Sequence, residues 1–526
     1  MDNSSQNQNI KMALDYHEST KHSEESLRAD THFLDLETKP LPFKVYRGVE
    51  SVPLLRDPDI LDAPTPAALD AITIPVGQIQ DEDAAEKIPD LATLSQVLFL
   101  AAGITKQKNY PGGTVYFRAY SNTGALYHID LYVVTQDLPE LPAGVYHFGP
   151  HDFALHRLRQ GDYRALLVEA SGAHPNIARA PLILISASTY WRNAWKYQAR
   201  AYRHCFWDGG TLHANLLAIA AAKELQPTLI MGFADAAVEA LLGLDPEREG
   251  ALTFVSLGRS DDQPPAAPPM DKLTFETEPL SRSEVDYPLI HATHVASSLA
   301  SGDEAVAWRG NTPEADAPPA SGPVQPLRPS TGAELPQESL ASVIRRRGST
   351  RAFDRSRSIS YEELSTVLDR STGSIPADFI KPPRTTLLDL YLIVNAVDGL
   401  APGTYYYRRA DQALELLAEG DFRRASGRLG LSQQLPADAA VNIYCLCSLV
   451  PILTRFGNRG YRAAQLEGGI TGGRIYLAAY AQHFGASGLT FFDDEVIDFF
   501  SPHAAGKAVL FLTALGHPDL ARINRQ

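Results

Sequence analysis

The sequence has few cysteines: only Cys205, Cys445 and Cys447 among 526 residues. A small and odd number argues against a disulfide framework and indicates a reducing compartment. Cys445 and Cys447 lie in the apolar run 441–450, which predicts a buried strand, and no second pair of ligands accompanies them. We therefore interpret both as core thiols rather than as a metal site.

Long apolar runs and an excess of positive charge are also missing. No stretch of about 18 apolar residues occurs, and the polar start at 1–11 lacks the apolar segment of a signal peptide. The chain has 47 Lys and Arg against 62 Asp and Glu, a net charge of −15, so no basic face is available to neutralise phosphates. We expect a cytoplasmic protein whose partners include neither nucleic acid nor membrane.

What the sequence does contain is an internal repeat. Segments of the second half match the first at an almost constant spacing of 259 positions. A chain of this length exceeds a single ordinary core, so the repeat predicts a duplicated domain of about 200 residues. The matching segments are 144–148 with 403–407, 161–164 with 420–423, 200–203 with 459–462, and 208–210 with 467–469.

Apolar patterning within each half predicts an α+β domain with a central sheet and a long core helix. In the first half we predict strands at 131–135, 144–148 and 181–187 and a helix at 208–224, and in the second half a helix at 468–483. Segments 261–270 and 311–339 are rich in Pro, Ala, Ser and Gly, as in linkers, whereas 287–308 is apolar enough to pack. The predicted organisation is domain 1 at 1–262, a linker at 263–338 and domain 2 at 339–526.

Five landmarks give the chain a resemblance to a known family. They are residues 16–23, 40–44, 121–127, 196–203 and 347–353. Together they resemble the SagB-type dehydrogenases, the azoline oxidases of the nitroreductase superfamily. The resemblance implies two nitroreductase-like domains that form an intrachain pseudo-dimer, with FMN bound between them.

The cofactor residues that the resemblance implies come from both halves. Arg347, Ser349 and Arg351 offer two guanidinium groups and a hydroxyl to a phosphate and a polar ring edge, a task that suits arginine geometry. A basic solvated turn is the alternative, since two further arginines precede them. The other implied residues are Arg118, the loop Ser121, Asn122, Thr123 and Gly124, for which an ordinary turn is the alternative, and Gly488 and Leu489.

The resemblance also marks Lys196 and Tyr197 as the pair that takes part in deprotonating the substrate. A lysine in a partly apolar pocket has a lowered pKa, as a general base requires. A surface lysine beside a packing tyrosine is the alternative. The equivalent positions of the second half hold Arg455 and Phe456, and arginine stays protonated.

Two further differences separate the halves. The second half lacks about eleven residues in the loop region, where 382–386 contains no Ser-x-x-Gly, and the first half has acidic residues at 84–89 in place of Arg-x-Ser-x-Arg. We therefore predict one FMN between the domains of the same chain and an inactive second site.

The predicted reaction is oxidation of an azoline ring to an azole in natural-product biosynthesis. Lys196 or Tyr197 would remove a ring proton while a hydride passes to FMN. The substrate is an azoline-containing peptide, a carrier-bound molecule or a small molecule, with other biosynthetic enzymes as possible partners. An NAD(P)H-dependent nitro or quinone reductase and a non-catalytic scaffold remain as alternatives.

Two motifs are set aside. His17, Glu18 and His22 do not have the spacing of a His-Glu-x-x-His zinc site, and no metal is predicted. The pairs Gly468-Gly469 and Gly472-Gly473 lie inside a predicted helix, where helix packing is favoured over phosphate binding.

Overall fold

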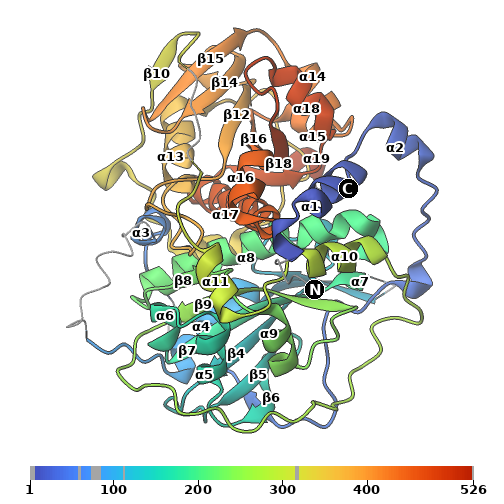
Figure 1. Cartoon of the computed structure of the whole chain (residues 1–526). Helices are drawn as coiled ribbons and strands as arrows, with labels where there is room; N and C mark the ends of the chain where they lie inside the picture. Colours follow the sequence, from blue (N-terminus) through green and yellow to red (C-terminus); the bar gives the residue numbers. More distant parts are fainter. Residues whose placement is uncertain (1–5, 57–60, 73–84, 111–112, 314–318, 524–526) are drawn as a thin grey trace.

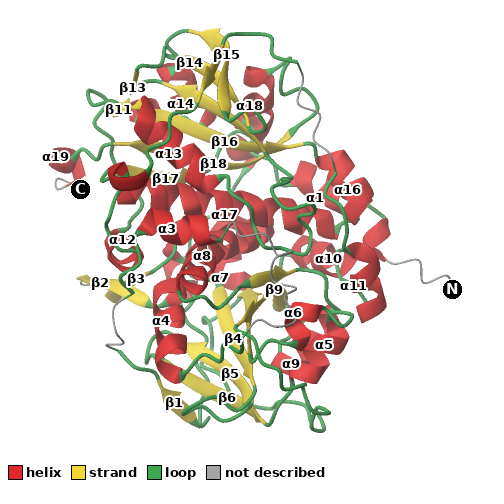
Figure 2. Ribbon diagram, turned by 90° about the vertical axis from the view of Figure 1, so that its left-hand side faces the viewer, coloured by secondary structure: helices red, strands yellow, loops and turns green. Residues whose placement is uncertain are grey.

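The computed structural model describes residues 6–56, 61–72, 85–110, 113–313 and 319–523. Two antiparallel sheets of seven strands lie at opposite ends of the molecule with helices between them (Figures 1 and 2). Their strand orders are β1-β6-β5-β4-β7-β9-β8 and β10-β15-β14-β12-β16-β18-β17, which correspond position by position. The α+β class and the intrachain pseudo-dimer predicted from the sequence are confirmed.

The first sheet consists of β1 (Ser51–Pro53), β4 (Ile129–Thr135), β5 (Gly144–Gly149), β6 (Ala154–Gln160), β7 (Leu182–Thr189), β8 (Thr228–Ile230) and β9 (Glu249–Leu257). The second consists of β10 (Val324–Pro326), β12 (Asp389–Val394), β14 (Gly403–Arg408), β15 (Ala413–Glu419), β16 (Val441–Cys447), β17 (Gly485–Leu489) and β18 (Ala508–Gly516). Two small pairs are β2 (Ile104–Tyr110) with β3 (Gly113–Arg118), and β11 (Ile359–Ser360) with β13 (Val397–Asp398).

The helices are α1 (Lys11–Ser19), α2 (Glu24–Ala29), α3 (Thr65–Ala71), α4 (Leu91–Ala102), α5 (Arg164–Ala170), α6 (Pro175–Ala178), α7 (Tyr190–Tyr197), α8 (Ala201–Ala222), α9 (Asp235–Leu242), α10 (Pro288–Ala296), α11 (Gly302–Trp308), α12 (Leu340–Arg346), α13 (Tyr361–Ser371), α14 (Arg423–Leu429), α15 (Gln434–Asp438), α16 (Leu449–Phe456), α17 (Arg459–Ala481), α18 (Asp493–Phe500) and α19 (Leu520–Ile523).

The long helices begin earlier than the apolar pattern predicts. Helix α8 begins at Ala201 rather than at 208, and α17 begins at Arg459 rather than at 468. The added turns contain Arg203, Arg459 and Arg462, which are buried although their side chains are charged. A pattern based on apolar residues misses these turns, because the arginines are buried by ion pairing between the halves.

Helices α8 and α17 cross in the centre of the molecule at glycines. A Cβ atom added at Gly469 would lie 2.4 Å from the carbonyl oxygen of Trp207, and one at Gly210 would lie 2.6 Å from the Cα of Gly469. Gly473 similarly faces the Cβ of Ala214 at 2.5 Å. Glycine normally weakens a helix interior, but here it allows the two backbones to touch. Helix packing is thus the role that the structure gives to Gly469 and Gly473.

Two reciprocal groups of ion pairs, each with one aspartate and two arginines, join the halves. Asp493 of the second half accepts hydrogen bonds from Arg200 and Arg203 of the first, at 3.1 and 2.7 Å. Asp235 of the first half accepts them from Arg459 and Arg462 of the second, at 2.6 and 2.8 Å. All six side chains are buried. The halves are therefore related by an approximate two-fold axis.

The predicted linker segment contributes ordered structure. Strand β10 pairs with β15, and helix α10 repeats the role of α1. The carbonyl oxygens of His17 and Thr20 accept hydrogen bonds from Arg203 and Arg200, and those of His294 and Ser297 accept them from Arg462 and Arg459. The residue boundaries between the domains remain a prediction.

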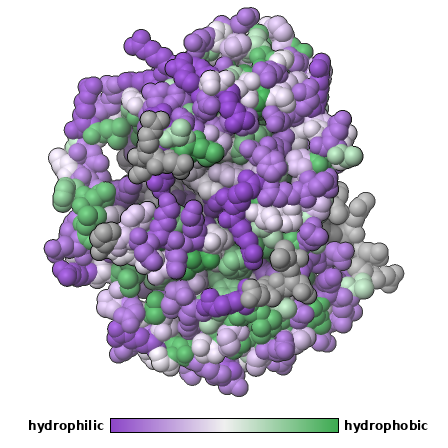
Figure 3. Space-filling model, turned by 180° about the vertical axis from the view of Figure 1, so that it is seen from behind, coloured by the Kyte–Doolittle hydropathy of each residue, from purple (hydrophilic) through white to green (hydrophobic). Residues whose placement is uncertain are grey.

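The face shown in Figure 3 is mostly hydrophilic, with small apolar areas between charged and polar side chains. Among the described residues, no helix is both long enough and apolar enough to cross a bilayer.

Candidate cofactor site between the two halves

The first-half loop is held by helix α8. The backbone N–H and the hydroxyl of Thr123 donate to the Asp208 carboxylate at 2.9 and 2.7 Å. The Thr211 hydroxyl donates to the carbonyl oxygen of Ser121. Asp208 is buried and also contacts His128 Nε2 at 2.8 Å. Helix α8 thus holds the loop 121–124 in place, while the residues of the loop remain partly exposed.

Gly124 lies against Tyr197. Its φ of +64° falls in the left-handed region that favours glycine, and an added Cβ atom would lie 2.9 Å from the Tyr197 hydroxyl oxygen. Sequence-distant parts of the predicted site, the loop and the Lys196-Tyr197 pair, are therefore adjacent.

From the second half, Arg347 reaches across the domain interface. Its guanidinium donates to the carbonyl oxygens of Ala119 and Arg118 at 3.1 and 3.2 Å, directly before the loop. It also lies over the Tyr476 ring, 5.6 Å from the ring centroid. Arg347 therefore lies beside the loop of the other half. The resemblance predicts that the cofactor binds next to these residues.

Tyr476 joins the remaining second-half residues. Its hydroxyl accepts the backbone N–H of Gly488 at 2.6 Å and lies 3.0 Å from the Ser349 hydroxyl. Sequence reasoning missed Tyr476, because a tyrosine in a long helix has the pattern of a core aromatic. Arg347, Ser349, Gly488 and its neighbour Leu489 are thereby brought together.

Two predicted arginines have other surroundings. The Arg118 guanidinium is buried within the first half, where it donates to the carbonyl oxygen of Pro42 at 2.5 Å and packs over Phe43 and Tyr127. The backbone carbonyl of Arg118, rather than its guanidinium, meets Arg347. Arg351 is exposed, and the motif's contacts with the first half come from Arg347.

The Lys196-Tyr197 pair ends helix α7. Lys196 is exposed beside Tyr197, with its Nζ 5.3 Å from the centroid of the Tyr197 ring, and so does not lie in the partly apolar pocket expected from the sequence. Tyr197 is half-buried, and burial raises the pKa of its hydroxyl well above the ordinary value. The phenol is therefore neutral near pH 7 and can donate a hydrogen bond.

A row of aromatic contacts leads from Tyr197 to the second half. The ring of His204 lies 4.7 Å from that of Tyr197 and 4.9 Å from that of Trp207. Trp207 then contacts Phe491 and Phe511 at 5.9 and 5.8 Å. Apolar, flat side chains from both halves thus adjoin the predicted cofactor residues.

Unpaired buried polar atoms provide a test of whether FMN fits here. The Tyr120 hydroxyl, the Asn122 amide nitrogen and the Thr490 hydroxyl have no hydrogen-bond partner among the described residues. Buried polar groups are normally paired, so these three groups beside the loop and strand β17 are available to a further partner. The polar ring edge of a flavin offers donors and acceptors of this kind, and Arg347 offers a cation for a phosphate. The residues present therefore fit FMN.

The pseudo-equivalent position on the other side of the interface is different. Its counterparts of Lys196 and Tyr197, Arg455 and Phe456, are covered by the chain itself. The indole N–H of Trp308 donates to the Phe456 carbonyl oxygen at 2.8 Å, and Arg455 donates to the carbonyl oxygen of Arg309 at 2.8 Å.

The Asp378 carboxylate lies at the same pseudo-equivalent position. By the register of the two sheets, Met231 and Gly232 correspond to Thr490 and Phe491. The backbone N–H groups of Met231 and Gly232 both donate to the buried Asp378 carboxylate, at 3.0 and 2.8 Å. A side chain of the protein thus pairs two backbone amides here, whereas the Thr490 hydroxyl at the first position has no partner among the described residues.

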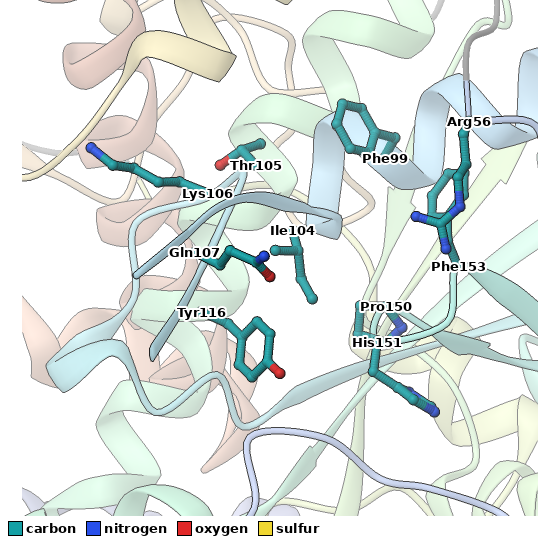
Figure 4. Close-up of a pocket in the computed structure, with 10 residues that line it drawn as sticks. All are labelled: Arg56, Phe99, Ile104, Thr105, Lys106, Gln107, Tyr116, Pro150, His151 and Phe153. Atoms are coloured by element: carbon teal, nitrogen blue, oxygen red, sulfur yellow. The ribbon is translucent and has the colours of Figure 1, made fainter. Parts of the chain in front are cut away.

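Two cavities lie away from these residues. One of about 450 Å³ is formed by α4, the β2–β3 hairpin and the β5–β6 turn, and its lining includes Phe99, Tyr116 and His151 (Figure 4). The other, of about 380 Å³, is lined by Tyr190, Trp191 and Ala194 of α7 together with residues 284–288 and others. Neither includes a predicted cofactor or catalytic residue.

Comparison with known proteins identifies the domain type. Residues 84–259 match the Nitroreductase family. "Putative nitroreductase MJ1384" of Methanocaldococcus jannaschii is 27% identical over 169 residues, which cover 32% of this chain and 80% of that protein. The trifolitoxin-processing protein TfxB of Rhizobium leguminosarum bv. trifolii is 29% identical over 179 residues, 33% of this chain and 48% of TfxB.

The fold of the whole chain also has a counterpart. The crystal structure of a putative nitroreductase from Anabaena variabilis superposes with a TM-score of 0.73 and 28% identity, covering 96% of this chain and 99% of that one. The similarity therefore extends over both halves, beyond the matched family region.

Proposed function

We propose that this chain, which carries a nitroreductase family domain at residues 84–259, is an FMN-dependent dehydrogenase that oxidises an azoline ring to an azole. The observation that carries the proposal is the asymmetry of the two pseudo-equivalent positions. One joins Arg347 of the second half to the loop 121–124 and Tyr197 of the first, while Asp378 and Trp308 fill the other.

Each half contributes different groups to the proposed site. Arg347 and Ser349 hold the phosphate, since a guanidinium and a hydroxyl both donate to its oxygens. The loop Ser121 to Gly124 would offer backbone and hydroxyl groups to the ring, and Leu489 of β17 would offer an apolar side chain. Bound FMN supplies the redox chemistry by accepting a hydride from the substrate.

Lys196 is the proposed base. It is exposed on the side of Tyr197, so a substrate that reaches the ring from solvent passes it. It takes the proton from the azoline carbon, while the neutral Tyr197 phenol, held between Gly124 and His204, orients the substrate by donating a hydrogen bond. Arg455 cannot do this at the other position.

The substrate class follows from the resemblance and one relative. TfxB is named as a processing protein for trifolitoxin. An azoline within a peptide, presented by other enzymes of a biosynthetic pathway, is accordingly the proposed substrate, and a carrier-bound or free azoline is the alternative.

Counting the flavin bound per chain tests the single site. Wild-type protein should bind one FMN, and Arg347→Ala should weaken FMN binding by about 2 kcal/mol or more, the usual value of a charged hydrogen-bonding group. Arg345→Ala is the matched control, since this neighbour is exposed and packs over Phe99. Two FMN per chain, or equal effects of the two substitutions, would contradict the proposal.

The role of Lys196 is tested with the flavin retained. Lys196→Ala and Lys196→Arg should both keep FMN and both lose turnover of a thiazoline or oxazoline substrate, because arginine keeps the charge but does not accept a proton. Activity in Lys196→Arg would exclude the base role. Rapid anaerobic bleaching of the flavin by NADPH, without azoline turnover, would instead support a reductase.

A further inference from the structure

A compact group of metal-ligating side chains lies at the β5–β6 turn of the first half. His151 and Asp152 are in the turn, and His156 follows on β6. One ligand atom from each lies within 4.8 Å of the other two. The Asp152 carboxylate lies 3.0 Å from His156 Nε2 and 3.7 Å from His151 Nδ1, and the two imidazole rings are parallel, with a 1° angle between their planes.

Hydrogen bonding does not account for this arrangement. His156 Nε2 is buried and has no hydrogen-bond partner among the described residues, although the Asp152 carboxylate is only 3.0 Å away. The two atoms are close without the alignment that a hydrogen bond requires. If the His156 proton is on Nδ1, Nε2 and the carboxylate are two neighbouring acceptors, an arrangement that a cation between them stabilises.

Gly149 allows two of these ligands to lie close together. A Cβ atom added there would lie 2.4 Å from an oxygen of Asp152 and 2.6 Å from His156 Nε2. Both distances are too short for a real Cβ contact, so any larger residue at this position would push the Asp152 and His156 ligand atoms away from their present places.

The spacing and ligand types also suit an ion. Two ligands of a tetrahedral zinc lie about 3.4 Å apart, and the observed 3.0 and 3.7 Å bracket this value. Imidazole nitrogen and carboxylate oxygen are both ordinary ligands of zinc. His151 also lines the cavity of Figure 4, which leaves one side of the group open to solvent.

We propose that His151, Asp152 and His156 bind one divalent transition-metal ion, with zinc as the ion that best matches two imidazoles, one carboxylate and an open fourth position. The site is separate from the proposed cofactor residues and does not depend on the proposed function. It revises the sequence-based expectation that no metal is bound.

Equilibrium dialysis of the full chain against Zn²⁺, after treatment with a chelator, tests the site. Wild-type protein should bind one Zn²⁺ per chain, and Asp152→Ala and His151→Ala, which change exposed residues, should weaken binding by at least about tenfold. His483→Ala is the matched control, because His483 is exposed and lies 3.8 Å from Glu338 without a third ligand.

Gly149→Ala provides an independent variant, since all three ligands remain while the added methyl group displaces the Asp152 and His156 side chains. It should also lose Zn²⁺, with its circular dichroism spectrum and flavin content unchanged. No stoichiometric Zn²⁺ in the wild-type protein, or equal binding by Asp152→Ala and His483→Ala, would overturn the proposal.

Discussion

Asp493→Asn should be among the most destabilising single substitutions at the interface between the halves. The Asp493 side chain is 1% exposed and lies between the guanidinium groups of Arg200 and Arg203, while it also accepts the backbone N–H of His22 at 2.8 Å. Removing its charge leaves two buried cations without a counterion. Breaking a buried pair in this way costs about 3–5 kcal/mol.

The neighbouring residue supplies the control. Asp494 is 67% exposed and pairs with Lys21, so Asp494→Asn should change the free energy of unfolding by less than about 1 kcal/mol. Both variants and the wild type would be unfolded in urea and followed by circular dichroism and tryptophan fluorescence. Stabilities of Asp493→Asn and Asp494→Asn within about 1 kcal/mol of each other would refute the reasoning.

The pH dependence gives a second measurement on the same variants. Burial alone would raise the pKa of Asp493, but Arg200, Arg203 and the His22 amide together hold it below its ordinary value. A carboxyl with a lowered folded-state pKa contributes stability above its unfolded pKa of about 3.9 and loses it as the pH falls through the folded pKa. The advantage of the wild type over Asp493→Asn should therefore be constant from pH 8 to about 5 and shrink below about pH 4.

Two further predictions use matched glycines. Gly469→Ala should lower the free energy of unfolding by about 1–3 kcal/mol, because its Cβ would lie 2.4 Å from the Trp207 carbonyl oxygen, whereas Gly468→Ala, 3.5 Å from the Phe511 Cβ, should be neutral or stabilising. Urea unfolding of the two variants would test this, and the reverse order would contradict the helix crossing. Gly124→Ala and Gly48→Ala share a φ of +64° and a strain of about 1–2 kcal/mol, but only Gly124 faces Tyr197. Gly124→Ala alone should therefore bind FMN more weakly in a flavin titration. Equal FMN affinities of Gly124→Ala and Gly48→Ala would show that Tyr197 is not part of the cofactor site.

The regular core could be predicted because its sequence signals are local. Strands β5 and β7 are fully buried and consist mostly of apolar residues, and their predicted bounds agree with the structure within two residues. The spacing of 259 also aligns Arg200 and Arg203 with Arg459 and Arg462, but it does not identify the aspartates that bind them. A repeat shows which residues of the two halves are equivalent, but not which residues they contact.

The contacts that cross the interface could not be predicted in the same way. Asp378 meets Met231 about 150 positions away, and a single aspartate in a loop has no pattern that marks it as a partner of backbone amides. Helix α10 was also not assigned as the counterpart of α1, because their match depends on backbone carbonyls rather than on similar side chains. Such pairings arise only when the two halves are brought together.

The fusion of the two halves explains why the two positions can differ. In a symmetric dimer of identical chains, every contact at one position is repeated at the other, so both would be filled or both left free. Here Trp308 and Asp378 close one position, while Arg347 and the loop 121–124 form the other. Substitutions can differ between the halves because the halves are not two copies of one chain. The ion pairs of Asp235 and Asp493 hold the unequal halves in register. Because Arg347 and Tyr197 come from different halves, neither half contains the proposed site alone.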